Sequence, residues 1–346
     1  MKSDQLNKLN CAIVGLGRSG QNLHIRLISE EINYRIKGVF DCDKKLSNQI
    51  SNKLDCVGYS CYEDILHDPE IQLIVIATPS KSHYELALRA LSSKKNVIIE
   101  KPITRNIKQA YELKSIAIKN KVYLIPFFNF RFAYDFLIIN DLLDRKYIGD
   151  IFLIKRNVSY FNRRDDWQSK LSDDGGIINA VLIHHLDQIL QITKSRPIDI
   201  FGDLRRIVSQ GDAPDHCKIL MNFKNNIFVD IEVSWAQKSK EFPWVIYGNK
   251  GVIRQEGNNI ICEYFIDNEI EKSTKSKLSY LSNENIKWRK IIKTNKEINN
   301  MGLTKYFYKE LYNSIKSNKK FKVDIDSVLE TMKIIDDIII KLDRKG

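Results

Sequence analysis

The sequence predicts an α/β protein of two domains: a doubly wound parallel sheet, then an α+β domain with a large, mostly antiparallel open sheet. Three observations favour this fold class. The chain has 346 residues, which is too long for one hydrophobic core and suits two domains of about 100–200 residues each. Strand-like and helix-like segments alternate as far as residue 127, which is typical of a parallel sheet. Later strands follow one another through short turns, which is typical of antiparallel pairing.

Residues 1–127 are predicted to form the first domain, with helices on both faces of its sheet. The segment 71–79 is apolar almost throughout, as expected for a strand covered on both faces. The segments between the strands have apolar residues at helical spacing. In chain order, we expect strands at 11–15, 34–41, 71–79, 96–100 and 122–127, and helices at about 19–31, 43–54, 82–93 and 107–120.

Residues 128–346 are predicted to form the second domain. Residues 266–302 are polar and rich in Asn, Lys and Ser, so we expect a long excursion or mobile loop there. Helices at about 303–316 and 326–342 end the chain, and the last helix can pack back on the first domain. In chain order, the preceding elements are a helix at about 133–145, a strand at 150–161, a polar loop at 162–175, a helix at 175–192 and several strands between 198 and 265.

The composition is that of a soluble, cytoplasmic protein. Hydrophobic residues make up 43% and charged residues 28% of the chain, and no apolar run approaches the roughly 20 residues of a membrane-spanning helix. The formal charge is +12, but lysines are interleaved with acidic residues along the whole chain, which favours an anionic small molecule over nucleic acid. Six cysteines without a CxxC pair predict neither a disulfide framework nor a metal site.

A glycine-rich turn after the first expected strand predicts a dinucleotide-binding site. Gly15, Gly17 and Gly20 have GxGxxG spacing, and they follow a strand and open a helix. In such a turn the first glycine permits a tight bend, the second lets the backbone approach a pyrophosphate, and the third allows close helix packing. The helix N-terminus supplies free N–H groups to the phosphates. The intervening Arg18 and Ser19 belong to this predicted site.

The second expected strand ends in an acidic residue that indicates the type of coenzyme. Asp41 lies 21 residues after Gly20, where a carboxylate can accept hydrogen bonds from the hydroxyls of the adenine ribose. A carboxylate at this position repels a 2′-phosphate, so we expect NAD rather than NADP. Arg18, between the glycines, is a weaker signal in the opposite direction.

Four motifs together resemble one family of dehydrogenases. They are GLGRSG, ATPSKSHYELALRAL, NVIIEKP and GGIINAVLIHHLD, in this order. The chain resembles the glucose-fructose oxidoreductase / inositol dehydrogenase / rhizopine-catabolism (Gfo/Idh/MocA) family. The resemblance covers most of the chain. It implies a Rossmann dinucleotide-binding domain followed by a domain whose open sheet makes oligomer contacts.

The segment NVIIEKP ends an apolar strand with Glu100, Lys101 and Pro102. Because open α/β sheets bind ligands beyond the carboxyl ends of their strands, Glu100 and Lys101 are expected at the cleft, beside the coenzyme. The resemblance implies that Lys101 binds substrate and takes part in proton transfer.

Two further segments match family positions near the cleft. The resemblance implies that Asn129 can reach the coenzyme and that Arg131 can reach the substrate, although Arg131 can instead tie the two domains together. The family positions that line the adenosine side of the coenzyme fall on Thr78, Pro79, Ser80 and His83. Alternatively, His83 is a helix N-terminal residue with a local hydrogen bond.

The family carries Asp-x-x-x-His on a helix of the second domain, followed by two residues and another Asp. His184 and Asp187 match this pattern, but Ala180 replaces the leading Asp. An Asp four residues before the histidine would share its helix face, orient the imidazole and raise its basicity. Three interpretations follow. His184 acts as base with support from Lys101 or Asn179; Lys101 carries the proton transfer, with a pKa lowered by burial; or the chain has lost catalysis and keeps only binding.

The loop before this helix resembles the family's substrate loop. It supplies aromatic rings and neighbouring arginines, and arginine suits a phosphate or carboxylate through bidentate hydrogen bonds. Alternatively, the loop is solvated and its arginines pair with Asp165 and Asp166. The predicted substrate-binding residues are Lys101, Arg131, Tyr160, Arg163, Trp167, Asn179 and His184.

The sequence therefore predicts an NAD(H)-dependent oxidoreductase of carbohydrate metabolism. It would transfer hydride between nicotinamide and a secondary alcohol or ketone of a sugar, inositol or nucleotide-linked sugar, with Lys101 and His184 as catalytic residues and without a metal. We expect a homodimer or homotetramer that forms through the second sheet. The alternative is an NAD-binding regulatory or catalytically impaired member of the family, which Ala180 favours.

Overall fold

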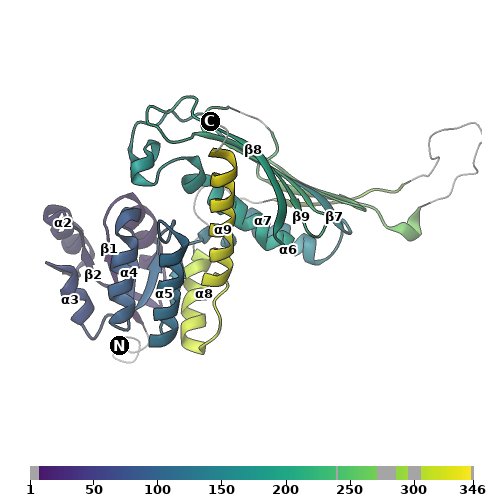
Figure 1. The fold of residues 1–346 in the computed structure, drawn as a ribbon. Coiled ribbons are helices and arrows are strands. Elements are labelled where there is room, and N and C mark those ends of the chain that lie inside the picture. The colour runs from purple at the N-terminus through teal and green to yellow at the C-terminus, as the bar shows by residue number, and fades with distance from the viewer. Residues whose placement is uncertain (1–7, 239–240, 271–285, 295–304, 344–346) are drawn as a thin grey trace, which may run out of the picture.

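Two sheets, each with helices packed against it, make up the fold (Figure 1). The structure, a computed structural model, describes residues 8–238, 241–270, 286–294 and 305–343. The first sheet is parallel with strand order β3-β2-β1-β4-β5-β6, and the second has eight strands in the order β14-β13-β12-β11-β7-β10-β9-β8. The predicted fold class is confirmed.

The first sheet reverses its strand order between β1 (Leu9–Val14) and β4 (Leu73–Ile76), which pair in parallel. Ligands of open α/β sheets bind at the carboxyl ends of the strands beside such a reversal. The other strands and the helices are β2 (Tyr34–Phe40), β3 (Val57–Gly58), β5 (Asn96–Ile99), β6 (Leu124–Pro126), η2 (Gly20–Ile25), α1 (Arg26–Ser29), α2 (Lys44–Leu54), α3 (Tyr62–His67), η3 (Ser80–Ser82), α4 (His83–Ser92) and α5 (Ile107–Asn120).

Local sequence explains where these helices begin. The side chain of Asp43 accepts hydrogen bonds from two backbone N–H groups at the start of α2, and Asn106 does the same for one N–H of α5. Two features were not predicted. The short pair β3 and α3 adds an edge to the sheet, and the helix after the glycine turn begins as a wide π-helical segment, η2.

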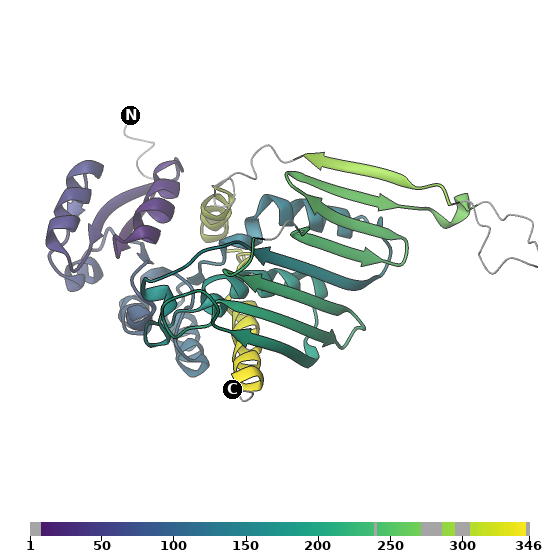
Figure 2. The ribbon, with the colours of Figure 1, turned by 90° about the horizontal axis from the view of Figure 1, so that it is seen from above.

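Among the described residues, the second sheet has one parallel pair, between β7 (Ile151–Ser159) and β10 (Phe228–Ser234), and its other strand pairs are antiparallel. Burial alternates along β9 (His216–Phe223), as expected when one face packs on helices and the other is open. Figure 2 shows the open face toward the viewer. The remaining elements are β8 (Pro197–Arg205), β11 (Trp244–Gly248), β12 (Gly251–Glu256), β13 (Asn259–Tyr264), β14 (Arg289–Thr294), η4 (Asn129–Phe132), α6 (Tyr134–Asp144), η5 (Trp167–Ser169), η6 (Leu171–Asp173), η7 (Ile178–Leu182), α7 (Ile183–Thr193) and η8 (Asp267–Glu269).

The segment 266–302 is only in part the loop that we expected. Residues 289–294 form β14, which pairs antiparallel with β13 at the edge of the second sheet. This strand was not predicted, because only Ile291 and Ile292 in it are apolar and nearly all of it is exposed. Residues 271–285 and 295–302 lie outside the described residues.

The terminal helices connect the two halves of the fold. On α8 (Lys305–Ser317), the ring of Phe307 packs edge-on against that of Phe127, with centroids 4.8 Å apart. The last helix, α9 (Ile325–Asp343), contacts α5 of the first sheet as well as α7 and β8 of the second (Figure 1). A division of the chain at residues 127 and 128 remains a prediction about folding units.

Candidate active site

The glycine turn leaves room for a pyrophosphate. Gly15 has φ of +92°, and a Cβ atom there would lie 2.7 Å from the carbonyl carbon of Ala77. A Cβ on Gly20 would lie 2.0 Å from the carbonyl oxygen of Gly15, so helix η2 can approach the turn only with glycine there. Gly17 has no neighbour within 4 Å of the same position. The turn therefore has the shape that the GxGxxG spacing predicted.

Asp41 lies against this turn. Its Oδ2 accepts a hydrogen bond from the backbone N–H of Leu16 at 2.7 Å, and its Oδ1 accepts one from Asp43 at 2.9 Å. Each carboxylate oxygen can accept a second bond, so Asp41 is fixed in place and still able to receive the ribose hydroxyls. Arg18 is exposed beside the turn, and Ser19 is partly buried.

Lys101 reaches from the end of β5 to the second domain. Its Nζ donates to the backbone carbonyl oxygens of Asn179 at 3.0 Å and Ala180 at 2.9 Å, both on η7. Burial lowers the pKa of Lys101 to about 8. The Glu100 carboxylate opposes this change, and the Arg18 guanidinium adds to it. Lys101 can therefore gain or lose a proton near neutral pH.

His184 begins the second turn of the same helical stretch and is 7% exposed. Its ring stacks on Phe130 with centroids 4.4 Å apart, and its Nδ1 is buried without a hydrogen-bond partner in the described part of the chain. Burial, then the charges of Lys101 and His185, hold the pKa of His184 well below its usual value. With Ala180 in place of Asp, the imidazole of His184 is therefore neutral, and no hydrogen bond from the described residues to Nδ1 orients it.

A second layer, which the sequence did not indicate, lies behind His184. Arg156 on β7 stacks over the ring of Trp244 at 4.3 Å and approaches Nδ1 of His185 at 3.0 Å. Burial lowers the pKa of Arg156 to about 10. His185, which is buried, therefore packs against a buried cation.

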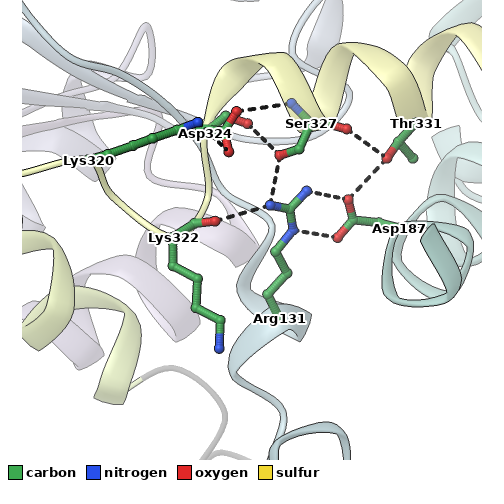
Figure 3. A network of polar contacts seen from close by, with 7 residues as sticks. All are labelled: Arg131, Asp187, Lys320, Lys322, Asp324, Ser327 and Thr331. Carbon is green, nitrogen blue, oxygen red and sulfur yellow. Dashed lines mark hydrogen bonds and ion pairs between the residues drawn. The ribbon is translucent and has the colours of Figure 1, made fainter. Parts of the chain in front are cut away.

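Arg131 requires a correction. It was predicted to reach the substrate, but it is 1% exposed and its guanidinium binds both carboxylate oxygens of Asp187 at 2.6 and 2.8 Å. It also donates to the hydroxyl of Ser327 and the carbonyl of Lys322, and Thr331 donates to Asp187 (Figure 3). Arg131 instead ties η4 to α7 and to the start of α9, all within the predicted second domain.

Three predicted coenzyme residues use their polar atoms inside the protein. Both ring nitrogens of His83 contact backbone carbonyls, of Pro102 at 2.7 Å and Thr78 at 2.8 Å, so the local hydrogen-bond interpretation holds. Burial lowers the pKa of His83, although these carbonyls oppose the change. Ser80 donates to Asp174 across the domains at 2.6 Å. Glu100 is nearly buried and turns its carboxylate toward His24.

The other predicted residues are distributed between the cleft and its rim. The Thr78 hydroxyl accepts from Ser82, Pro79 is exposed, and Asn129 is buried on η4. Asn179 donates its amide to the carbonyl of Asp174. In the loop, Arg163 and Trp167 are exposed, whereas Tyr160 accepts a hydrogen bond from the indole of Trp235.

The loop also contains the ion pair of the solvated alternative. Arg164 binds Asp166, and its guanidinium lies 5.2 Å from the ring centroid of Trp235. Arg163, by contrast, is exposed and forms no ion pair with the described residues, so it stays available for an anionic group.

Comparisons with known proteins agree with this arrangement. Residues 9–128 match the family model "Oxidoreductase family, NAD-binding Rossmann fold", and residues 136–254 match "GFO/IDH/MocA C-terminal domain". The chain belongs to the Gfo/Idh/MocA oxidoreductase family. The predictions of this family and of NAD as cofactor are thereby confirmed.

Three members of the family illustrate the similarity. An uncharacterized oxidoreductase of Escherichia coli, YhhX, is 26% identical over 244 residues, or 70% of each chain. The myo-inositol 2-dehydrogenase of Thermotoga maritima is 24% identical and covers 71% of this chain and 74% of its own. The crystal structure of GenD2 from gentamicin A biosynthesis in complex with NAD has a TM-score of 0.81 at 19% identity, covering 98% of this chain and 95% of its own.

Neither a membrane-spanning helix nor a metal-binding cluster occurs among the described residues. No helix among them combines the length and apolar character needed to cross a membrane. Likewise, the described ranges contain no group of three or more His, Cys, Asp or Glu residues that could hold a metal ion.

Proposed function

We propose that this Gfo/Idh/MocA protein is an NAD(H)-dependent dehydrogenase acting on a secondary alcohol, or in reverse a ketone, of a sugar, inositol or nucleotide-linked sugar. The observation that carries the proposal is Lys101. Lys101 follows β5 at the carboxyl edge of the parallel sheet. Its ammonium donates hydrogen bonds to η7, the segment that precedes His184. Burial lowers the pKa of this ammonium to about 8, which suits a group that exchanges a proton with the substrate.

The coenzyme would be held by the glycine turn and Asp41. Gly17 offers open backbone to the pyrophosphate, and the fixed Asp41 carboxylate would receive the ribose hydroxyls and repel a 2′-phosphate. NAD, when bound, supplies the acceptor for the hydride that leaves the carbinol carbon.

Lys101 would move the proton. In oxidation, neutral Nζ accepts the proton of the substrate hydroxyl while the C–H bond breaks; in reduction, the ammonium returns it to the ketone oxygen. His184 stays neutral and acts as a hydrogen-bond partner that orients the hydroxyl, because burial beside Lys101 opposes a second positive charge. Among the three interpretations of Ala180, we favour proton transfer by Lys101.

The substrate class is supported by the surroundings of the cleft and by relatives. Trp167 and Arg163 are exposed on the neighbouring loop, where an aromatic ring suits a sugar face and a guanidinium suits an anionic group. A family member from Thermotoga maritima is a myo-inositol 2-dehydrogenase.

The experiment is a substrate panel with matched variants. Wild-type protein, Lys101→Ala and His184→Ala are incubated with NAD and inositols, free sugars and nucleotide-linked sugars, and reduced nicotinamide is followed by absorbance. We expect Lys101→Ala to lose turnover by about a thousandfold and to keep NAD affinity within several-fold. Full turnover in both variants would overturn the assignment.

A catalytically impaired, NAD-binding regulator is the second candidate. The orphaned Nδ1 of His184 and the absence of an acid at Ala180 favour it. Binding of NAD by the wild type with no turnover across the panel, in either direction, would support this candidate.

We also infer a homodimer or homotetramer through the open face of the second sheet. Phe201 on β8, 61% exposed, and Phe228 on β10 are exposed apolar side chains on this sheet. Light scattering of the wild type and of Phe201→Glu would test this; a wild-type monomer would contradict it.

A further inference from the structure

Three buried side chains from distant parts of the sequence form a row of hydrogen bonds that ends at Lys101. The hydroxyl of Tyr308 lies 2.5 Å from Nδ1 of His24, and Nε2 of His24 lies 3.2 Å from Oε1 of Glu100. The other oxygen of Glu100 accepts the backbone N–H of Lys101 at 3.2 Å. The row joins α8, the helix after the glycine turn and the end of β5. His24 and Tyr308 are completely buried.

The partners define the direction of each bond. A carboxylate only accepts, so Nε2 of His24 carries the hydrogen that Glu100 receives. The ring then accepts at Nδ1, and the hydroxyl of Tyr308 donates to it. All three groups are satisfied with a neutral imidazole, and the carboxylate keeps its charge.

This charge acts on Lys101. Burial alone would raise the pKa of Glu100, but the hydrogen bond that His24 donates and the nearby positive charge of Lys101 lower it. The charged groups that act on Lys101 are Glu100, which favours the ammonium, and Arg18, which opposes it. The charge of Lys101 in turn lowers the pKa of His184. Loss of the Glu100 charge would leave Arg18 unopposed.

We propose that His24 and Tyr308 are positioning residues for Lys101 that act through Glu100, holding its carboxylate ionised beneath the lysine and so setting the pH at which Lys101 exchanges its proton. The proposal rests on the proposed function of Lys101. Tyr308 thereby links helix α8 to the chemistry of the cleft.

A neighbouring tyrosine provides a matched control. Tyr34 packs edge-on against the ring of Tyr308, with centroids 5.5 Å apart, and donates its hydroxyl to the backbone carbonyl of Tyr308. It is equally part of the buried cluster but makes no bond to His24 or Glu100. Tyr34→Phe therefore removes a buried hydroxyl without interrupting the row.

The experiment measures the proton affinity of Lys101 without a substrate. Full-length protein is pulse-acetylated with acetic anhydride across a pH series, and the label on Lys101 is quantified by peptide mass spectrometry. We expect a midpoint near pH 8 in the wild type and a midpoint about one pH unit lower in Glu100→Gln and His24→Leu. Tyr308→Phe should show a smaller shift of the same sign. His24→Gln, which keeps a donor, should restore the wild-type midpoint, and Tyr34→Phe should not change it.

Two results would overturn the proposal: an unshifted midpoint in Glu100→Gln, or a shift in Glu100→Gln with none in Tyr308→Phe and His24→Leu. Should His24→Leu fail to fold by circular dichroism, Tyr308→Phe and His24→Gln decide the matter. Failure of the proposed function looks different. In that case the midpoints shift as expected, but Lys101→Ala does not lower turnover.

Discussion

The imidazole of His184 and the phenyl ring of Phe130 are stacked, with planes inclined by only 15°. Gln188, one turn further along the helix, donates to the backbone carbonyl of Phe130 at 2.8 Å and fixes the segment that carries the ring. Since no carboxylate of the described chain binds Nδ1 of His184, the stacking partner does the orienting that an Asp at position 180 would do.

The first prediction concerns this stack. Phe130→Leu removes the flat surface under the imidazole, and such an aromatic contact contributes about 0.5–1.5 kcal/mol. We expect turnover to fall about tenfold, with NAD affinity within twofold of the wild type. Phe132→Leu on the same short helix, whose ring packs on Phe307, serves as the control. Equal turnover in the two variants would contradict the role of Phe130.

The second prediction concerns pH. Oxidation of an alcohol needs neutral Lys101, so kcat/KM for oxidation should rise with pH and level off above about 8. Reduction of the ketone needs the ammonium, so its kcat/KM should fall over the same range. Both profiles are measured on one substrate pair. If oxidation and reduction changed in the same direction through this range, the sign of the argument would be wrong.

The third prediction restores the missing acid. Ala180→Asp places a carboxylate one turn before His184. The backbone carbonyl of the same residue already accepts a hydrogen bond from the ammonium of Lys101. An added negative charge favours the ammonium and the imidazolium, so the pH midpoint of oxidation should move up by about one unit. Ala180→Asn has the same size without the charge and should leave the midpoint unchanged. Superimposable profiles of the two variants would refute the argument.

The fourth prediction concerns the buried ion pair in Figure 3. Asp187→Asn leaves the guanidinium of Arg131 buried without its charge partner, which typically costs about 3–5 kcal/mol of the free energy of unfolding. Thr331→Val removes one hydrogen bond to the same carboxylate and should cost about 1 kcal/mol. Urea unfolding followed by circular dichroism measures both. A larger loss in Thr331→Val than in Asp187→Asn would exclude this ranking.

The fifth prediction concerns coenzyme choice. Asp41→Ser removes the carboxylate that repels a 2′-phosphate, so the ratio of NADPH to NADH affinity should rise at least tenfold. Asp43→Ala is the matched control, because Asp43 caps α2 and lies two residues away. Titration by nucleotide fluorescence measures the ratio. A similar ratio change in both variants would assign the effect to the loop instead of to Asp41.

Patterns of short range could be read from the sequence. The GxGxxG spacing predicted a turn in which Gly15 has a positive φ, and the apolar run of β5 predicted that Lys101 would emerge at a sheet edge. In both cases the physical cause lies within a few residues.

Relationships between distant residues could not be read in this way. Nothing local distinguishes Arg131 as a partner of Asp187 from Arg131 as a substrate ligand, because the choice depends on where α9 packs. The same holds for His24, whose partners Glu100 and Tyr308 lie 76 and 284 residues further along the chain. β14 was not predicted, because an exposed edge strand has little hydrophobic pattern.

The position of α8 and α9 at the end of the chain has a consequence for synthesis. Tyr308, Ser327 and Thr331 complete polar networks whose other members are translated much earlier. While the ribosome is still adding the last helices, His24 and Arg131 are without these partners, and the aromatic face at Phe127 lacks its cover. A nascent chain that still lacks α8 and α9 therefore exposes apolar surface and incompletely hydrogen-bonded side chains, which favours binding by chaperones and cleavage by proteases.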